Sequence, residues 1–331
     1  MSNILILSQT DIDALLSQGD PRVANEIIDL MQTTFVKFTQ GHDDEEKALQ
    51  AQSPQRIGIS TDSHKVLFMP SRLDTTTSIK IVSVPTKEGL SGLPATILVL
   101  DESTGCVQAV MNAGALTAVR TAAGSGLATR LYANPESKNL VVFGAGAQGR
   151  SHVDMMIAVR PSLERISIWN RGEKRRLELI KELQKAYPTR TFVSANEELE
   201  NEVQNADIVC TCTNATEPVL FGKWLKSGVH LNCVGSYRMD MHEVDAETVK
   251  RAETIVVDSV GACAHEAGEL VKSSKSEDWI EMGNLFLDNV KPDVTKISLF
   301  KSVGISVQDS AISGLMVELA KKQNLGTTVP Y

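Results

Sequence analysis

The sequence predicts an α/β protein with a doubly wound parallel sheet of the Rossmann type and a second domain of α+β character. Its 331 residues exceed what one hydrophobic core usually organises, so two domains are expected. From residue 139 onward, β-like and helical segments alternate, as in a parallel sheet with crossover helices. A glycine-rich turn, GAGAQG, directly follows the first of these strands.

The first hundred residues mix helical and β-like segments. Ser8 is placed to cap a helix in ILSQTDIDALL, with Asp11 as its partner three residues on, and ANEIIDLMQTTFVKFTQ has helical spacing. The polar stretch GHDDEEKALQAQSPQ is expected to be an exposed loop. The runs RIGIS, KVLFMPSRL, SIKIVSV and ATILVLDESTGCVQAVM follow without helices between them, which predicts an antiparallel or mixed sheet.

The pattern changes from residue 113. GALTAVRTAAGSGLATRLYA is rich in small residues and predicts one closely packed helix. Strands are then expected at LVVF, RISIWN, TFVSA, DIVCTCT, HLNCVGS and TIVVDS, with helices between the earlier ones. The final segment predicts a strong amphipathic helix from about residue 306 to residue 323.

Composition excludes several classes of protein. A net charge of −8 argues against a general nucleic-acid or anionic-membrane binder. The chain has no run of about 18 apolar residues and no basic leader, so we expect a cytoplasmic protein. Five scattered cysteines suit reduced thiols, and neither they nor the histidines show metal-ligand spacing, so no metal is expected. His64, His230 and His242 are interpreted as surface or strand-end residues.

The glycine turn predicts a dinucleotide site. Gly144 can make the tight turn, Gly146 lets the backbone approach a pyrophosphate, and Gly149 permits close packing of the helix on the strand. The helix that follows offers free N–H groups and the positive end of its dipole to the phosphates. The intervening Ala145, Ala147 and Gln148 are therefore also expected at the cofactor.

The end of the second strand indicates which cofactor is preferred. Asn170 and Arg171 stand where NAD-preferring folds carry an acidic residue for the ribose hydroxyl. A guanidinium group there favours a 2′-phosphate, and Lys174, Arg175 and Arg176 follow. NADPH is thus predicted ahead of NAD, although these cations could instead be solvated residues of a helix's first turn.

The order of these segments resembles the ornithine cyclodeaminase/mu-crystallin family over nearly the whole chain. The resemblance is carried by RIGIS, MPSRL, SIKIVSV, ALTAVRTAAGSGLATR, VVFGAGAQG, CTNATEPVL and FKSVGISVQD, in that order. It implies that the Rossmann domain, residues 123–305, is inserted into a domain for substrate binding and dimerisation formed by residues 1–122 and 306–331. A homodimer is expected from the resemblance alone.

The resemblance also assigns roles to residues. Lys80 matches the family's active-site lysine, and Arg56 and Arg120 match the arginines that hold the substrate carboxylate, with Met69 of MPSRL expected at the same pocket. Guanidinium groups clamp a carboxylate with directional bonds, and a lysine can donate the proton that accompanies hydride transfer. Like-charge repulsion from the arginines is expected to lower the pKa of Lys80.

Further cofactor contacts are implied by the resemblance, all at strand or helix ends. They are Thr121, Thr211, Thr213, Val234, Gly235, Ser302 and Gly304, with Lys301 and Val303 also expected near the nicotinamide. Two acidic positions of the cyclodeaminases are replaced by Tyr237 and Leu67, which argues against ornithine cyclodeamination.

These observations predict an NADPH-dependent reductase of a cyclic ketimine such as Δ1-pyrroline-2-carboxylate or Δ1-piperideine-2-carboxylate, giving an L-amino acid. An amino-acid dehydrogenase of the alanine type is the nearest alternative, followed by ornithine cyclodeaminase. A dinucleotide-binding protein without turnover, like mu-crystallin in the lens, is the alternative outside the enzymes. No nucleic-acid or membrane partner is expected.

Overall fold

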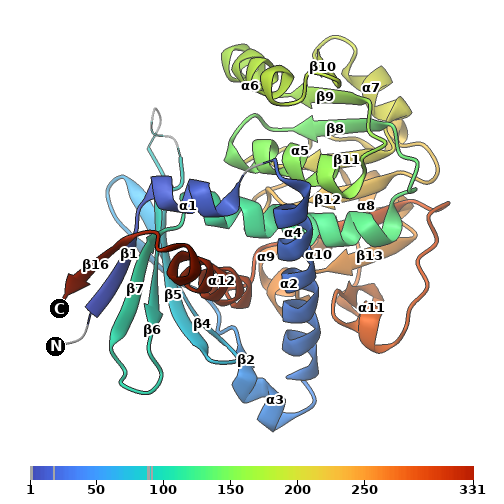
Figure 1. Ribbon diagram of the computed structural model, residues 1–331. Coiled ribbons are helices and arrows are strands. Elements are labelled where there is room, and N and C mark those ends of the chain that lie inside the picture. Colours follow the sequence, from blue (N-terminus) through green and yellow to red (C-terminus); the bar gives the residue numbers. More distant parts are fainter. Residues whose placement is uncertain (1–2, 18, 88–89, 91) are drawn as a thin grey trace. The chain divides into compact units, whose positions relative to one another are not determined.

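A computed structural model describes residues 3–17, 19–87, 90 and 92–331 of the chain (Figure 1). The chain divides into two compact units. Unit 1 comprises Met1–Arg120 together with Ile305–Tyr331, and unit 2 comprises Thr121–Gly304. Unit 2 is thus one continuous stretch of chain, whereas unit 1 is formed from two stretches far apart in the sequence.

Unit 1 is built on a mixed sheet that has eight strands among the described residues, in the order β16-β1-β7-β6-β5-β4-β2 with β3 paired to β4. Its pairs are antiparallel except that of β1 with β7. The prediction of an antiparallel or mixed sheet is therefore confirmed. The strands are β1 (Asn3–Leu7), β2 (Ala51–Gln52), β3 (Ile57–Ser60), β4 (His64–Leu73), β5 (Thr76–Pro85), β6 (Ala95–Leu100), β7 (Val107–Asn112) and β16 (Thr327–Pro330).

The helices of unit 1 follow their predicted caps. In α1 (Gln9–Leu16) the hydroxyl of Ser8 accepts from the Asp11 amide and the Asp11 carboxylate accepts from the Ser8 amide, which confirms the capping box. The predicted second helix is α2 (Pro21–Gln40), capped by Asp20. The segment expected to be a loop instead contains α3 (Glu45–Gln50), because the Asp44 carboxylate caps it and acidic residues suit the positive end of a helix.

The final helix, α12 (Val307–Gln323), differs from the amphipathic helix that was predicted. All seven residues from 307 to 313 are buried, including polar ones, so its first two turns have no solvent face. The helix packs on β4, β5 and β6 and against α1 and α2. Its polar side chains are therefore interior groups that need partners within the protein.

Unit 2 is a Rossmann fold, as predicted, and its sheet has eight strands among the described residues. Their order is β10-β9-β8-β11-β12-β15-β13-β14, and the pairs are parallel. The first five positions reproduce the 3-2-1-4-5 order of dinucleotide-binding sheets. The strands are β8 (Asn139–Phe143), β9 (Arg165–Trp169), β10 (Thr191–Ser194), β11 (Ile208–Thr211), β12 (His230–Cys233), β13 (Thr254–Val257), β14 (Ile280–Glu281) and β15 (Ser298–Lys301).

Helices flank this sheet, as the alternation of segments predicts (Figure 1). The small-residue segment forms α4 (Gly114–Tyr132), within which the boundary between the units falls. The remaining helices are α5 (Ala147–Val159), α6 (Glu173–Ala186), α7 (Leu199–Asn205), α8 (Ala246–Arg251), α9 (Val260–Glu266), α10 (Gly268–Val271) and α11 (Asn284–Leu287), with short 3-10 turns at Gly222–Trp224 and Ser276–Asp278. No helix in the described part of the chain has the length and apolar character needed to span a bilayer.

Candidate functional site

Lys80 lies in the middle of β5, in the interior of unit 1. Alternation along the strand places its side chain on the buried face with those of Ser78 and Val82. Across the sheet it is paired with Met69 on β4 and Ile97 on β6, both also buried. A lysine with a side chain only 1% exposed is rare unless it is paired, so its partners are informative.

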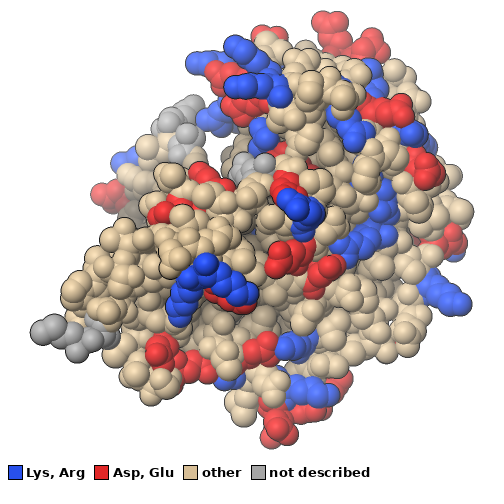
Figure 2. All heavy atoms as spheres, in the orientation of Figure 1, with Lys and Arg blue, Asp and Glu red and all other residues tan. Residues whose placement is uncertain are grey.

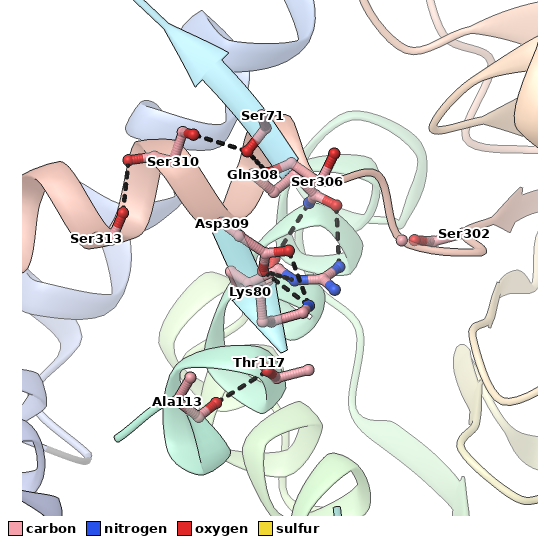
Figure 3. Close-up of polar contacts among 12 residues, drawn as sticks. Ser71, Lys80, Ala113, Thr117, Ser302, Ser306, Gln308, Asp309, Ser310 and Ser313 are labelled. Atoms are coloured by element: carbon pink, nitrogen blue, oxygen red, sulfur yellow. Dashed lines mark hydrogen bonds and ion pairs between the residues drawn. The ribbon is translucent and has the colours of Figure 1, made fainter. Parts of the chain in front are cut away.

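Lys80 and Arg120 share the carboxylate of Asp309, and Figure 3 labels Lys80 and Asp309 of this group. The Lys80 ammonium donates to Asp309 Oδ1 at 2.9 Å and lies 2.8 Å from Oδ2, a contact that is out of line for a second hydrogen bond. Arg120 Nε donates to the same Oδ1 at 3.1 Å. Lys80, Arg120 and Asp309 thus form a buried group, hereafter the charge cluster, that carries two positive charges and one negative charge.

Gln308 completes the surroundings of Arg120. The Arg120 Nη1 donates to the side-chain oxygen of Gln308 at 3.0 Å, while the Gln308 amide nitrogen lies 3.4 Å from the Arg120 carbonyl. The guanidinium is therefore held on two sides by consecutive residues of α12. The plane of the guanidinium is therefore fixed. A group that binds a carboxylate in one orientation needs such a fixed plane.

The pKa of Lys80 is lowered to about 7. Burial is the largest cause, and the positive charge of Arg120 is the second, with a smaller contribution from Arg56. Asp309 opposes them by attraction and by its hydrogen bond. The predicted direction is thus confirmed, and burial, rather than the charge of the arginines, contributes most.

The two other residues expected at the substrate occupy different settings. Arg56 is half-buried just before β3, and its charge acts on Lys80. Met69 is 3% exposed and lies opposite Lys80 in the sheet. Asp309 and Gln308 were not predicted, because an acidic residue in the first turn of a helix is also explained by the helix dipole.

In unit 2, the predicted cofactor residues gather at the carboxyl ends of neighbouring strands. Gly144 follows β8, Asn170 follows β9, Thr213 follows β11, and Val234 follows β12. The chain order reverses between β8 and β11, and such a switch point is where open parallel sheets bind ligands.

The glycine turn has the geometry that the motif requires. Gly144 has φ +110°, and a Cβ there would lie 2.6 Å from the Cys212 carbonyl oxygen. A Cβ at Gly149 would lie 1.9 Å from the Gly144 carbonyl oxygen, so helix and turn pack at a distance only glycine allows. At Gly146, by contrast, an added Cβ meets open space. Gly146 caps α5 without a side-chain bond to its first turn, which leaves N–H groups there available to phosphate oxygens.

The segment after β9 is held by hydrogen bonds to the glycine turn and to α6. Asn170 Oδ1 accepts from the Ala145 amide at 3.1 Å, and the Arg176 guanidinium donates to the Asn170 carbonyl at 3.0 Å. Arg176 is buried, so it is a structural residue and not one of the solvated cations. Arg171 and Lys174 are exposed, and Figure 2 shows basic and acidic side chains mixed over α6. Gln148 Oε1 is buried without a partner in the described residues.

A buried glutamate that was not predicted, Glu243, ties the ends of β11 and β12 together. Its carboxylate accepts from the hydroxyls of Thr211 and Thr213 at 2.8 and 2.7 Å, and from the amides of Thr213 and Gly235 at 2.6 and 2.7 Å. Burial, and then the nearby Glu269, raise the pKa of Glu243. The Glu243 carboxylate thus fixes the backbone of Thr213 and Gly235 at the switch point. The hydroxyls of Thr211 and Thr213 help to hold this carboxylate in place.

The Asp258 carboxylate likewise holds the chain that follows β15. Its Oδ2 accepts from the Ser302 hydroxyl and from the Gly304 amide, each at 2.7 Å, and Gly304 has φ +82°. Lys301, expected near the nicotinamide, is fully buried and paired with Glu269 at 2.8 Å. Its ammonium thus belongs to an interior ion pair at the end of β15.

The remaining predictions concern single residues. Thr121 is buried in α4, and Val234 is 9% exposed. His230 begins β12 as a strand-end residue but is buried, with Nδ1 2.9 Å from the Ser298 hydroxyl. The cysteines are free thiols, and no group of metal-ligand residues occurs in the described part of the chain.

Comparison with known proteins shows that this chain is similar to several reductases. Residues 9–324 match the model of the ornithine cyclodeaminase/mu-crystallin family. Ketimine reductase mu-crystallin of Mus musculus is 29% identical over 308 residues, which cover 91% of this chain and 94% of the mouse protein. Delta(1)-pyrroline-2-carboxylate reductase of Bacillus cereus is 29% identical over 290 residues, which cover 83% of this chain and 87% of that protein.

One solved structure extends the likeness to three dimensions. Delta(1)-pyrroline-2-carboxylate reductase of Thermococcus litoralis, in complex with NADH and L-proline, matches with a TM-score of 0.88 and 30% identity. The match covers 98% of this chain and 100% of that chain.

Proposed function

This chain belongs to the ornithine cyclodeaminase/mu-crystallin family, and on that premise we propose that it reduces a cyclic ketimine carboxylate to the corresponding L-amino acid. Δ1-Pyrroline-2-carboxylate and Δ1-piperideine-2-carboxylate are the substrates proposed first. The relatives named as reductases of such compounds support the reaction class. The observation that carries the proposal is the charge cluster, in which a lysine that can exchange a proton near neutral pH lies beside a fixed guanidinium.

The charge cluster suits a small anionic imine. Two positive charges against one negative leave a net positive charge in a buried place, which favours an anion. Arg120, held by Asp309 and Gln308, is proposed to bind the substrate carboxylate together with Arg56. Lys80 is proposed to donate a proton to the imine nitrogen. Tyr237 and Leu67 stand where the cyclodeaminases carry acidic residues, and the lack of these two acids argues against cyclodeamination.

The reaction balances with these residues. When bound, the dinucleotide supplies the hydride that adds to the imine carbon. The π electron pair of the C=N bond moves to nitrogen, which takes a proton from the Lys80 ammonium, so that an imine becomes a secondary amine. The neutral Lys80 amine then regains a proton from solvent, a step that a pKa of about 7 permits near neutral pH.

NADPH is the proposed cofactor, with NAD as an alternative. The glycine turn, with its open Gly146 and available amides at the start of α5, is proposed to hold the pyrophosphate. The exposed Arg171 is proposed to bind a 2′-phosphate, with Lys174 nearby. Thr121, Thr213 and Gly304 are proposed among the remaining contacts.

We also propose a homodimeric protein of the cytoplasm that takes only small-molecule substrates. Ile57 and Ile59 of β3 are 63% and 53% exposed, an apolar surface that a second copy of unit 1 would cover. The free thiols suit a reducing compartment.

A substrate panel tests the proposed function. Purified protein is mixed with NADPH or NADH and with cyclic imines, pyruvate plus ammonia, or ornithine, and cofactor oxidation is followed by absorbance. Cyclic imines are expected to give the highest kcat/KM. Faster turnover of pyruvate plus ammonia would support an alanine-type dehydrogenase instead. Release of ammonia from ornithine without added reductant would contradict the assignment of Tyr237, and binding of NADPH without any turnover would indicate a binding protein.

A further inference from the structure

Asp309 is the one acid within the charge cluster, and its position suggests more than neutralisation. Its Oδ1 accepts from both Lys80 Nζ and Arg120 Nε, at 2.9 and 3.1 Å. The two groups assigned to the proton and to the substrate carboxylate therefore share a single oxygen atom. Lys80 Nζ also lies 2.8 Å from Oδ2, so the distance between the two groups is set by the Asp309 carboxylate and not by β5 and α4 alone.

Asp309 is itself held firmly by the helix that carries it. The Ser71 hydroxyl on β4 donates to the Ser306 carbonyl at 2.7 Å and lies 2.7 Å from the Ser310 hydroxyl (Figure 3). The Ser78 hydroxyl on β5 lies 2.8 Å from the same Ser310 hydroxyl. A Cβ at Gly314 would lie 2.8 Å from the Thr76 hydroxyl oxygen, so α12 also approaches β5 closely one turn further on. The start of α12 is thus fixed to the two strands that carry Met69 and Lys80.

We infer that Asp309 is a positioning residue of this site: its one carboxylate fixes the Lys80 ammonium and the Arg120 guanidinium together, so that proton donor and carboxylate clamp keep one mutual geometry. The inference rests on the proposed function for its catalytic meaning. It is independent of that function as a statement about the ionisation of Lys80.

The electrostatic consequence follows from the groups that face Lys80. Arg120 on α4 and Arg56 before β3 repel its positive charge, while Asp309 on α12 attracts it. The neighbours across the sheet, Met69 and Ile97, are uncharged. Asp309 is therefore what keeps Lys80 protonated up to about neutral pH despite burial and two like charges.

Replacing Asp309 with Asn tests the inference, since Asn has the same shape but no charge. Loss of the charge is expected to lower the pH above which kcat/KM declines, by on the order of one unit. Turnover at the optimum is expected to fall on the order of 100-fold, and KM to rise, because the two cations lose their common anchor. Asp309→Glu keeps the charge, so its pH profile is expected to return toward that of the native protein although its turnover stays reduced.

Glu318→Gln is the matched control, because it removes an exposed carboxylate from the same helix. Its pH profile and turnover are expected to equal those of the native protein. A native pH profile in Asp309→Asn would overturn the inference. Should Asp309→Asn fail to fold, as judged by circular dichroism, the Asp309→Glu profile decides: a profile displaced to lower pH despite the retained charge would then contradict it.

A second measurement does not depend on turnover. With lysine labelled by ¹³C at Cε, the Lys80 resonance is assigned by its disappearance in Lys80→Met and followed by NMR over pH. Its midpoint is expected to be lower in Asp309→Asn than in the native protein, and an unchanged midpoint would overturn the inference. If no imine is turned over but this midpoint moves, the proposed function fails while the role of Asp309 stands.

Discussion

Each unit of this protein buries a lysine against a carboxylate, yet the two lysines differ in chemistry. In unit 1, Lys80 meets Asp309 with Arg120 beside it, and its pKa falls to about 7. In unit 2, Lys301 meets Glu269, hydrogen bonds with Ser236, and has its pKa raised. Both side chains are essentially inaccessible to solvent, so burial alone does not explain the difference.

The sign of the surrounding charge explains it. Burial lowers the pKa of either lysine and is the largest single cause at both. At Lys301, the negative charge of Glu269 and then that of Glu243 are the largest causes that oppose burial, and the pKa is raised. At Lys80, Arg120 and Arg56 add to burial, and among the described residues Asp309 opposes it. An excess of positive charge nearby makes a buried lysine able to release a proton at neutral pH, whereas an excess of negative charge keeps the lysine protonated.

The largest expected effect separates the two lysines by activity. Lys80→Met removes the proposed proton donor, and kcat with a cyclic imine is expected to fall about 10²–10⁴-fold, because that is the usual contribution of general acid catalysis. NADPH binding, measured by fluorescence titration, is expected to stay within about twofold, because unit 2 is unchanged. A Lys80→Met variant with native turnover would remove Lys80 from the mechanism.

The next effect concerns stability. Lys301→Met leaves Glu269 buried without its cation and close to Glu243, so the free energy of unfolding is expected to fall by about 3–5 kcal/mol. All three tryptophans lie in unit 2, so their fluorescence in a denaturant series reports this unit. The double variant Lys301→Met/Glu269→Gln is expected to recover part of the loss, because Gln removes the buried charge but keeps an acceptor for the Ser236 hydroxyl or the Glu243 amide. If Lys301→Met were as stable as the native protein, the ion pair would have no structural role.

An exposed cation gives a third case and a smaller effect. Arg171→Asp is expected to shift the ratio of kcat/KM for NADPH to that for NADH toward NADH by roughly tenfold or more, because the 2′-phosphate loses its proposed partner. Stability is expected to change by no more than about 0.5 kcal/mol, since the side chain is solvated. Lys181→Asp, on an exposed position of α6, is the control. An unchanged ratio would contradict the assignment of Arg171.

The last expected effect is the pH dependence of stability. Between pH about 7 and 10.5, Lys80 is deprotonated in the folded protein but still protonated in the unfolded chain, so the unfolded state binds more protons and stability rises with pH. The rise from this group is at most about 1.4 kcal/mol per pH unit. For Lys301 the sign is opposite, because its raised pKa makes the contribution present below pH 10.5 and lost above it.

Unfolding followed by circular dichroism at pH 7 and pH 9 checks this difference. The rise from pH 7 to pH 9 is expected to be smaller in Lys80→Met than in the native protein. Equal slopes in the two proteins would mean that Lys80 does not lose its proton in this range.

The sequence alone determined the fold class and the class of cofactor, a nicotinamide dinucleotide. A glycine turn after an apolar strand works through backbone geometry within a few residues, so GAGAQG indicated the binding edge before any tertiary contact was known. Capping of α1 by Ser8 is equally local. The strands β1 and β16 were missed because the two chain ends pair with each other across the length of the sequence. The alternation of segments likewise did not predict which strands pair with each other.

Tertiary structure decided what each charged residue does. In the sequence, Lys80 lies in a predicted strand and Lys301 at the end of another, and no local pattern distinguishes their environments. The family resemblance identified Lys80 but not Asp309, which holds it. Asp309 is 229 positions from Lys80, and Glu269 is 32 from Lys301, so no local pattern could pair them. Whether a lysine donates protons or stabilises a core depends on burial and on the sum of neighbouring charges, and both exist only once α12 and the sheets are packed.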